Sequence, residues 1–304
     1  MSTISFIDDN MVLAKYYLQR DYSELAEEIK LKKGKFTGYI ELYEMLAGFT
    51  VSKNESLSKM SNSNFFVVRF TLANFQTSHV VQQEELLIEL MQSLKKYMNR
   101  MKGYYNLRIP SHVVDIIRSY NNIFSGGFFC GGTIEEIING KVVNCSTKEK
   151  LSIFFADKVY IYQHFEELLN LTFDSFKEYN SQYHISPYTD KFAGKIYENW
   201  IYNSLKNDNG NIVIADYAGV CIGFIILAEK EIAMEGVLNA VNEKYRNHGA
   251  YRSMLCYAIN EATRKGKSFV ISTQLDNFIV QGVWNSVGLR PFYSIYNMHI
   301  LVEQ

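Results

Sequence analysis

The stretch from Val241 to Arg252 reads VNEKYRNHGAYR, and the interpretation of the second half of the chain depends on it. An apolar run of strand type ends at Val241, a polar turn follows, and a helical pattern begins near Gly249. Backbone N–H groups at such a junction have no partner inside the helix, and the helix dipole adds positive potential. A glycine lets a ligand approach the backbone closely. The segment is thus as good a candidate for a phosphate or pyrophosphate site as for an ordinary strand–turn–helix connection.

Outward from this turn, the C-terminal half alternates strand and helix patterns. Strands are predicted at 158–162, 211–216, 220–228, 235–241, 268–273 and 293–302. Helices are predicted over 165–176, 192–205 and 251–262, and from a cap at Asp276 or Asn277 to Gly288, with a loop at 179–188 and a hairpin turn at 217–219. The order β-α-α-β-β-β-α-β-α-β predicts a mixed α/β sheet with helices on its faces.

The first half of the chain is less regular. Helical stretches are predicted at 21–31 and 39–46, a polar loop at 52–64, a strand at 65–70 and a long helix at 84–101. A strand–helix–strand pattern over 106–109, 112–120 and 127–130 resembles the tail of the second half in outline. We therefore divide the chain into an α/β domain at 1–150, a candidate degenerate copy of the second fold, and a second domain at 151–304.

Composition excludes several classes of protein. The chain has 304 residues, of which 47% are hydrophobic and 21% charged, and its net charge is -1, so neither general disorder nor nucleic acid as the main partner is expected. The N-terminus lacks a secretory pattern, and no apolar run approaches the roughly 20 residues that span a bilayer, which favours a cytoplasmic protein without a membrane partner. The four cysteines form no C-x-x-C pair and have no histidine at ligand spacing, so no metal is expected.

Arg246, Gly249 and Tyr251 form the pattern V-x-x-x-Y-R-x-x-G-x-Y followed by a helix. This pattern is similar to the acetyl-CoA motif of the GNAT superfamily of acetyltransferases, R/Q-x-x-G-x-G/A, although Tyr251 stands where the family has a small residue. Downstream, STQLDNFIVQGVWNSVGLRPF resembles the closing strand–helix–strand of that family, with Asn277 and Trp284 in the family's places. The resemblance runs from about Val159 to the end of the chain.

The resemblance implies acetyl-CoA as cosubstrate and a mixed, mostly antiparallel sheet with helices on both faces. It implies that the strand ending at Val241 lies beside the strand at 268–273 and that their ends part to admit the pantetheine arm. Backbone N–H groups near the end of the first strand would orient the thioester and stabilise the oxyanion. The residues implied at the coenzyme are Leu238, Asn239, Ala240, Val241, Arg246, Asn247, His248, Gly249, Ala250, Tyr251, Asn277 and Trp284.

The resemblance also implies direct transfer, in which a neutral amine attacks the thioester and the leaving thiolate needs a proton. In many relatives a tyrosine of the last helix supplies it. Here that place is Trp284, whose indole N–H is not a usable acid, so we expect Trp284 to form a wall of the cofactor tunnel. The remaining candidates for proton transfer are His184, Tyr293, Tyr296 and His299, or solvent.

A narrower resemblance concerns the acceptor. The stretch FKEYNSQYHISPYTDKFAGKIYENWIYNSL, the pair Thr273-Gln274 and the segment Arg108 to Pro110 are similar to TDP-fucosamine acetyltransferases, which implies an amino group on a nucleotide-linked deoxysugar. Aromatic rings with polar tips suit sugar faces, and an ordinary surface loop has the same composition. The candidate substrate residues are Tyr179, Tyr183, His184 and Tyr188.

Two other functions stay open. The acceptor could instead be an amino acid, a polyamine or another small amine, because acceptor specificity resides in loops. The departures at Tyr251 and Trp284 favour a third hypothesis, a non-catalytic sensor that binds CoA or has lost it. In each case the expected partner is a small molecule, and the chain is expected to be a monomer or a homodimer.

Overall fold

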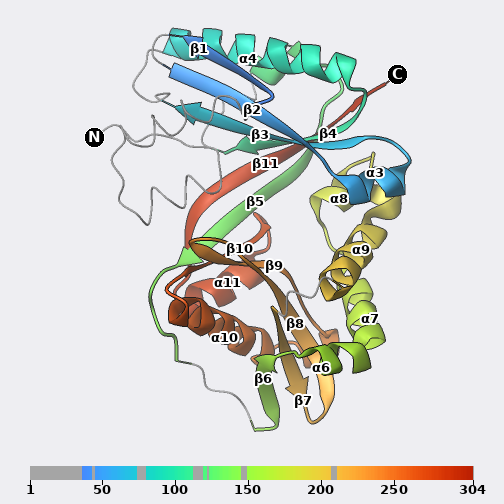
Figure 1. The fold of residues 1–304 in the computed structure, drawn as a ribbon, viewed down its shortest axis with the longest axis vertical. Coiled ribbons are helices and arrows are strands. Elements are labelled where there is room, and N and C mark those ends of the chain that lie inside the picture. Colours follow the sequence, from blue (N-terminus) through green and yellow to red (C-terminus); the bar gives the residue numbers. More distant parts are fainter. Residues whose placement is uncertain are drawn as a thin grey trace. The chain divides into compact units, whose positions relative to one another are not determined.

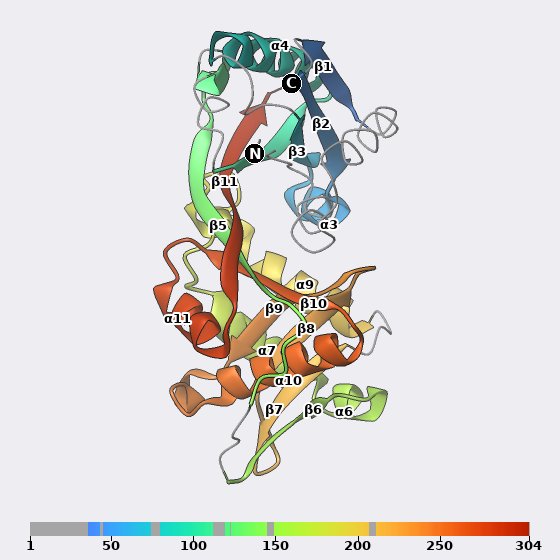
Figure 2. The same ribbon diagram turned by 90° about the vertical axis from the view of Figure 1, so that its left-hand side faces the viewer.

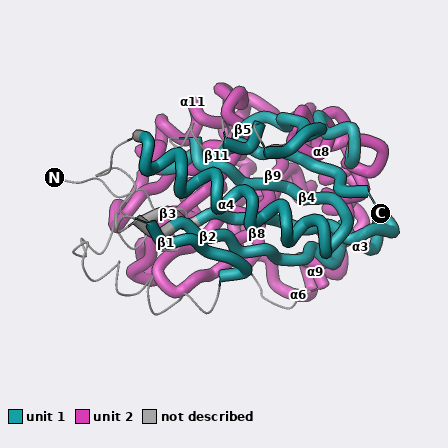
Figure 3. Tube along the Cα trace, turned by 90° about the horizontal axis from the view of Figure 1, so that it is seen from above, with its two compact units in different colours: residues 1–132, 185–189, 293–304 teal, residues 133–184, 190–292 magenta. Residues whose placement is uncertain are grey.

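The computed structural model describes residues 36–42, 45–73, 80–111, 119–121, 123–144, 149–206 and 211–303 (Figure 1). Two compact units are present: unit 1 is Met1–Gly132, Ile185–Thr189 and Tyr293–Gln304, and unit 2 is Thr133–His184 and Asp190–Phe292 (Figure 3). Two strands, β5 (Phe128–Ile138) and β11 (Arg290–Val302), contribute residues to both units. No helix in the described ranges is long and apolar enough to cross a bilayer.

The strands of unit 2 are hydrogen-bonded in the order β5-β10-β9-β8-β7-β6. They are β6 (Leu151–Phe155), β7 (Ile212–Tyr217), β8 (Val220–Glu229), β9 (Ala233–Val241) and β10 (Ser268–Gln274), together with part of β5. The helices are α6 (Lys158–Gln163), α7 (Phe165–Phe176), α8 (Gln182–Ile185), α9 (Ala193–Lys206), α10 (Ala250–Arg264) and α11 (Phe278–Val287), with short 3-10 turns η3 (Asp190–Phe192) and η4 (Glu243–Tyr245). β9 and β10 run parallel, and the other neighbouring strands run antiparallel.

Alternate residues of the unit 2 strands face two layers of helices. On β7, Val213 and Ala215 belong to an apolar cluster with residues of α10 and α11, whereas Ile212 and Ile214 belong to a second cluster with residues of α7 and α9. Successive side chains of a strand point to opposite faces of its sheet, so the two helix pairs cover opposite faces. Figure 2 shows α10 and α11 on one side of the strands and α7 and α9 on the other.

Unit 1 has a sheet of the same kind in the order β1-β2-β3-β4-β11. Its elements are β1 (Gly38–Leu42), β2 (Met45–Lys53), α3 (Glu55–Ser61), β3 (Phe65–Ala73), α4 (Val80–Arg100) and β4 (Gly103–Pro110), with the end of β11. The parallel pair is β3 and β4, joined through α4, and the succession β1-β2-β3-α4-β4 repeats β7-β8-β9-α10-β10 with the same strand directions. The expected fold class, a mixed and mostly antiparallel sheet with a second copy in the first half, is confirmed.

Three predictions about local structure are wrong. The run 158–162 is helix α6, because Asp157 accepts a hydrogen bond from the Tyr160 N–H (2.8 Å) and so caps a helix, while Tyr162 is 86% exposed and has no sheet to pack on. The edge strand of unit 2 is instead β6, a few residues earlier. Residues 39–42 and 45–46 are not helical, since they belong to the paired strands β1 and β2, and the alternating burial of β1 has the period of a strand. The polar stretch 52–64 contains helix α3, capped by Asn54.

The remaining described elements agree with the sequence patterns, apart from short shifts at their ends, the brief helix α8 inside the predicted loop at 179–188, and β5, which was predicted at 127–130 and continues to Ile138. The predicted helix at 21–31, most of the one at 112–120 and the helix end at 207–210 lie outside the described residues.

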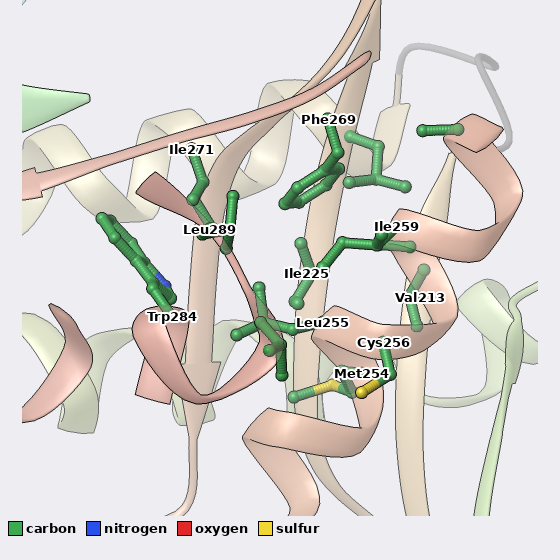
Figure 4. Close-up of a cluster of buried hydrophobic side chains, with 14 of the residues drawn as sticks. Val213, Ile225, Met254, Leu255, Cys256, Ile259, Phe269, Ile271, Trp284 and Leu289 are labelled. Atoms are coloured by element: carbon green, nitrogen blue, oxygen red, sulfur yellow. The ribbon is translucent and has the colours of Figure 1, made fainter. Parts of the chain in front are cut away.

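The core of unit 2 between its sheet and α10 is closely packed (Figure 4). Ile259 of α10 is 1% exposed and lies in the same cluster as Val213 and Phe269. On the neighbouring helix α11, Ile279 is 83% exposed. The two isoleucines therefore give a matched pair, one packed against the sheet and one in solvent.

We expect Ile259→Ala to lower the free energy of unfolding by about 2–5 kcal/mol, because the change removes buried methyl groups and leaves a cavity. Ile279→Ala should change it by less than about 0.5 kcal/mol, since an exposed side chain loses little. Urea denaturation followed by circular dichroism measures both. Equal losses in the two variants would contradict the packing of α10.

Candidate active site

Strands β9 and β10 lie side by side and then part. Their parallel pairing runs from Ala233 and Ser268 to Gly236 and Ile271, where it ends. Beyond that point β9 continues to Val241 paired with β8, and β10 continues to Gln274 paired with β5. The expectation that these strands are neighbours with parted ends is confirmed.

A β-bulge stands at the point of parting. Ile226 of β8 faces Leu238, but the next residue, Leu227, faces Gly236, so Val237 is an extra residue on β9. A bulge bends its strand and increases the local twist. The bulge therefore accompanies the divergence of β9 from β10, and it changes which residues of β9 face each helical layer.

The parting leaves one edge of β9 open. The Asn242 N–H donates to the Ile222 carbonyl across the β8–β9 pair (2.8 Å). Because bonded and non-bonded positions alternate in an antiparallel pair, residues 240 and 238 also bond toward β8, and Asn239 and Val241 direct their N–H and C=O groups to the other edge. At that edge the Val241 carbonyl accepts a hydrogen bond from Arg246 Nε (3.3 Å). The N–H and C=O groups of Asn239 are thus available to an extended ligand.

The turn after β9 leads into α10, and the first backbone N–H groups of α10 have no partner within the helix. The Asn242 side chain accepts from the Lys244 N–H (3.1 Å) and shapes η4, and His248 Nδ1 donates to the Arg246 carbonyl (2.7 Å). Gly249 caps α10 at φ 86° without a side-chain hydrogen bond. The first N–H to bond within the helix is that of Ser253, to the Gly249 carbonyl (2.9 Å), so residues 250–252 present free donors.

Two backbone features make room for a ligand at this helix end. Gly249 has positive φ, and a Cβ added there would meet no atom within 4 Å, so the space in front of the turn is open. Asn247 also has a left-handed backbone, with φ 64°. Arg246, Asn247 and His248 are exposed, while Ala250 is buried against the sheet. Free donors, the helix dipole and exposed basic side chains together suit an anion such as a pyrophosphate.

The two departures from the coenzyme motif contact each other. Trp284 of α11 is 0% exposed, and its Nε1–H donates to the Tyr251 hydroxyl at 2.8 Å. The Tyr251 side chain therefore points inward, away from the open N–H groups of its own helix end. A large residue at this position is compatible with the anion site because the side chain packs in the interior and only the backbone faces the turn.

A group of polar side chains lies at the end of β10, beyond the point where its pairing with β9 ends. Asn277 caps α11 through its Oδ1, which accepts from the Val280 N–H (3.4 Å), and its Nδ2 donates to Thr273 Oγ1 (3.0 Å). The hydroxyl of Tyr179 is 3.4 Å from Thr273 Oγ1 and 3.5 Å from Asn277 Nδ2. The hydroxyl of Tyr179, which belongs to the segment after α7, therefore lies next to the side chains of Thr273 and Asn277 at the N-terminus of α11.

The structure adds Glu136, which the sequence patterns did not single out. Glu136 lies on β5 opposite Ile271, in the row that ends the β9–β10 pairing. Its side chain is 0% exposed, and neither carboxyl oxygen has a hydrogen-bond partner among the described residues. Burial raises the pKa of this carboxyl to about 7. Glu136 lies beyond the strand predicted at 127–130, in the part of β5 that the sequence pattern did not indicate, and β5 precedes the part of the chain where the motif lies.

The opposite face of the same sheet carries aromatic side chains. Tyr179 and Tyr183 pack against the cluster of α7 and α9, and both rings lie edge-on to Tyr197 (6.3 and 6.1 Å between ring centroids). His184 stacks on Tyr197 (6.1 Å), and its Nδ1 is 3.0 Å from Ser181 Oγ. Burial lowers the pKa of the His184 imidazole, so the ring is neutral at neutral pH. Leu238 and Ala240 of β9 face this same cluster.

The other candidates from the sequence belong to unit 1. Tyr188 donates to the Gly126 carbonyl (3.0 Å) and packs against Tyr104, and the remaining three lie on the β11 segment that this unit contains. Tyr293 is buried, and Tyr296 packs edge-on against Phe129 (5.5 Å between ring centroids). His299 is 2% exposed beside Phe65, and burial lowers its pKa to about 4. Unit 2 by itself contains the turn at 242–249, Asn277, Trp284 and the aromatic group around His184.

No protein-family model matches the chain, and no curated protein matches it. Solved structures do. A GCN5-related N-acetyltransferase from Sphaerobacter thermophilus superposes with a TM-score of 0.58 at 10% identity, covering 92% of this chain and 86% of that one. A tandem GNAT protein from the clavulanic acid biosynthesis pathway superposes with a TM-score of 0.50 at 7% identity over 99% of both chains.

A third structure is the GCN5-related glucosamine N-acetyltransferase region of a fungal multi-domain β-N-acetylglucosaminidase. It superposes with a TM-score of 0.54 at 10% identity, covering 99% of this chain and 38% of that longer one. These likenesses show that the chain has the fold of GCN5-related N-acetyltransferases, with a tandem relative among its structural neighbours.

The contact between Tyr251 and Trp284 can be measured in a double-mutant cycle. Tyr251→Phe leaves a buried indole N–H without its acceptor and should lower the free energy of unfolding by about 1–3 kcal/mol. The double variant Tyr251→Phe/Trp284→Phe should lose less than the sum of the single variants by about 1 kcal/mol, because neither partner is left unpaired. Urea denaturation of the four proteins gives the coupling energy. Additive losses would show that the hydrogen bond does not form.

Proposed function

We propose that unit 2 is an acetyl-CoA-dependent N-acetyltransferase that acts on a small amine. The observation that carries the proposal is the parting of β9 and β10 next to the open N-terminus of α10, in a chain with the fold of GCN5-related N-acetyltransferases. The parted edge of β9 suits an extended amide-bearing arm, and the helix end suits a pyrophosphate. These are the two parts of coenzyme A that lie between its adenosine and its thiol.

The residues around the parting fit such a coenzyme. The N–H groups of residues 250–252 and the side chains of Arg246 and His248 would hold the pyrophosphate, and the open N–H and C=O of Asn239 would pair with the arm. The bound coenzyme supplies an acetyl thioester. The backbone N–H of the bulged residue Val237, near the parting, would stabilise negative charge on the thioester oxygen.

The amine would approach from the face of α7 and α9. The half-buried carboxylate of Glu235 projects to this face, because its neighbours Met234 and Gly236 face the cluster of α10 and α11. Glu235 can therefore accept the proton that the amine loses, directly or through water. His184, held neutral by burial, is a second group on the same face that can accept a proton.

We further propose an amino sugar as the acceptor. Tyr179, Tyr183, His184 and Tyr197 form an aromatic wall with polar tips on the acceptor face, which suits the alternating apolar faces and hydroxyl edges of a sugar. The similarity of the segment 176–205 to TDP-fucosamine acetyltransferases supports this choice. The fold neighbour described as a glucosamine N-acetyltransferase region agrees with it.

The coenzyme site is tested with two matched glycines at the ends of α10. Gly249 and Gly266 both have positive φ, and a Cβ added to either meets nothing within 4 Å. Gly249→Ala and Gly266→Ala should each cost about 1–2 kcal/mol in backbone strain. Gly249→Ala alone should also weaken acetyl-CoA binding by about tenfold or more, or about 1.4 kcal/mol, because its methyl group would occupy the pyrophosphate position. Calorimetry with acetyl-CoA measures both, and no binding by the unmodified protein at high micromolar concentration would refute the site.

The acceptor is tested with a panel of amines in a thiol-release assay. A nucleotide-linked amino-deoxysugar should be acetylated faster than spermidine or free lysine. Tyr183→Ala and His184→Ala should raise the KM for the sugar about tenfold, because each removes a contact with the acceptor. The Kd for acetyl-CoA should stay unchanged, because neither side chain contacts the coenzyme. Preference for a polyamine would favour the alternative in which the acceptor is another small amine. Coenzyme binding without release of its thiol in the presence of any amine would favour a sensor.

A further inference from the structure

Acetyl transfer leaves a coenzyme thiolate that needs a proton, and Trp284 cannot provide it because indole N–H is a donor without acidity at neutral pH. The hydrogen bond between Trp284 and Tyr251 indicates a different proton donor. In it the tryptophan is the donor and the Tyr251 oxygen is the acceptor (2.8 Å). The O–H proton of Tyr251 is therefore free for a third group, and it has no acceptor among the described residues.

The surroundings keep that proton on the tyrosine. Burial raises the pKa of Tyr251; the Trp284 hydrogen bond lowers it, and the nearby Tyr179 and Glu136 raise it again. The Tyr251 hydroxyl is fixed in place by its hydrogen bond to Trp284, a residue of α11 that is 0% exposed and packed in the buried cluster. Such a group donates a hydrogen bond to an anion readily, and it passes its proton to a thiolate only when a stronger acid replaces that proton in the same step.

Glu136 is the second buried group in this place, and burial raises the pKa of its carboxyl to about 7, so it carries a proton below that pH. Its carboxyl is 0% exposed, without a hydrogen-bond partner in the described part of the chain, and it faces the cluster of α10 and α11 beside Ile271. The titratable group that faces it from α10 is Tyr251, and no charged side chain contributes to its raised pKa, which follows from burial alone. A buried carboxyl without a partner is costly unless it has a function or a ligand.

Resting on the proposed acetyl transfer, we propose that Tyr251 is the catalytic acid that protonates the coenzyme sulfur, with Trp284 as its positioning residue and Glu136 as the group that returns its proton. As the amine nitrogen bonds to the acetyl carbon, the C–S bond breaks and its electron pair goes to sulfur. In the same step Tyr251 gives its proton to the sulfur and takes one from the Glu136 carboxyl, so that no buried tyrosinate forms. Glu136 is then reprotonated from solvent, which has received the proton lost by the amine.

The first test compares Tyr251→Phe with Tyr257→Phe, a half-exposed tyrosine of the same helix that packs edge-on to Phe155. Tyr251→Phe should lower kcat about 10²-fold or more, the usual range for loss of an acid or base. Its Kd for acetyl-CoA should stay within about threefold of the unmodified protein, since the hydroxyl would contact only the sulfur. Tyr257→Phe should change neither. Trp284→Phe should lower kcat less than Tyr251→Phe does, because the hydroxyl remains but is no longer held.

A second readout does not depend on turnover. Above a pH of about 8.5, where a free thiol ionises, the unmodified protein should bind CoA more tightly than desulfo-CoA, because the Tyr251 O–H stabilises the thiolate. Tyr251→Phe should abolish this difference and leave the affinity for desulfo-CoA unchanged. Calorimetry across pH measures both ligands. The double variant Tyr251→Phe/Trp284→Phe, which leaves no buried group unpaired, repeats the measurement if the single variant folds poorly.

The contribution of Glu136 is read from the pH dependence of kcat. The carboxyl holds its proton below a pKa of about 7 and loses it above, so the ratio of kcat for the unmodified protein to kcat for Glu136→Gln should fall as pH rises through about 7. Glu135→Gln, the neighbour on the opposite face of β5, is the control and should follow the unmodified profile. A ratio independent of pH would remove Glu136 from the proton path.

Two results would overturn the role of Tyr251. One is a kcat for Tyr251→Phe within about threefold of the unmodified value, far from the loss expected for a catalytic acid. The other is an equal loss of kcat and acetyl-CoA affinity, which would make the residue structural. If the unmodified protein binds no acetyl-CoA at all, the proposed function fails, and the role of Tyr251 fails with it.

Discussion

The last backbone pairing between β9 and β10, at Gly236 and Ile271, is the constraint on which the candidate site depends. Parallel strands joined through a helix are ordinarily paired along their shared length, and here the pairing stops while both strands continue. β9 stays paired with β8 on both sides of the bulge at Val237, and β10 stays paired with β5. The backbone groups of Asn239 are left open, and the turn that follows brings the free N–H groups of α10 to the same end of the sheet.

Unit 1 repeats this parting, but its corresponding strand β3 has no bulge. The pairing of β3 and β4 ends at Arg69 and Arg108, after which β3 pairs with β2 and β4 pairs with β11. The register of β2 and β3 is continuous, with no extra residue on β3. The connecting sequence at 74–79, NFQTSH, contains no glycine. The two copies share a topology, and the sequence places the candidate phosphate-binding turn in the second copy.

The sequence was informative where local chemistry fixes local structure. Gly249, Asn277 and Gly288 occupy helix-end positions with a conformational or hydrogen-bonding requirement, and all three were predicted there and are found there. Patterning failed where a cap outweighs propensity, as at Asp157, which begins a helix in a β-branched run. It also failed for β1 and β2, whose glycines and mixed polarity hid the period of a strand.

Pairings between distant segments could not be predicted from spacing. Tyr251 and Trp284 looked like two separate departures from a coenzyme motif, and the structure joins them by one hydrogen bond. Glu136 reaches the same cluster from β5, far from both in the chain, because β5 pairs with β10. The segment 179–188 looked like one loop with one role, yet Tyr183 and His184 belong to unit 2 and Tyr188 to unit 1. Such juxtapositions depend on strand order, which no local pattern encodes.

Hydrogen exchange of the backbone with and without CoA tests the central claim most directly, because it reports on the parted strands themselves. Saturating CoA should slow exchange by about tenfold or more at Asn239 and at residues 250–252, whose N–H groups would then be bonded. Residues 70–73 of β3, at the corresponding parting in unit 1, serve as an internal reference and should exchange at an unchanged rate. Binding of CoA by calorimetry with no protection at Asn239 and residues 250–252, or with protection at residues 70–73 instead, would contradict the assignment of the coenzyme to the parting of β9 and β10.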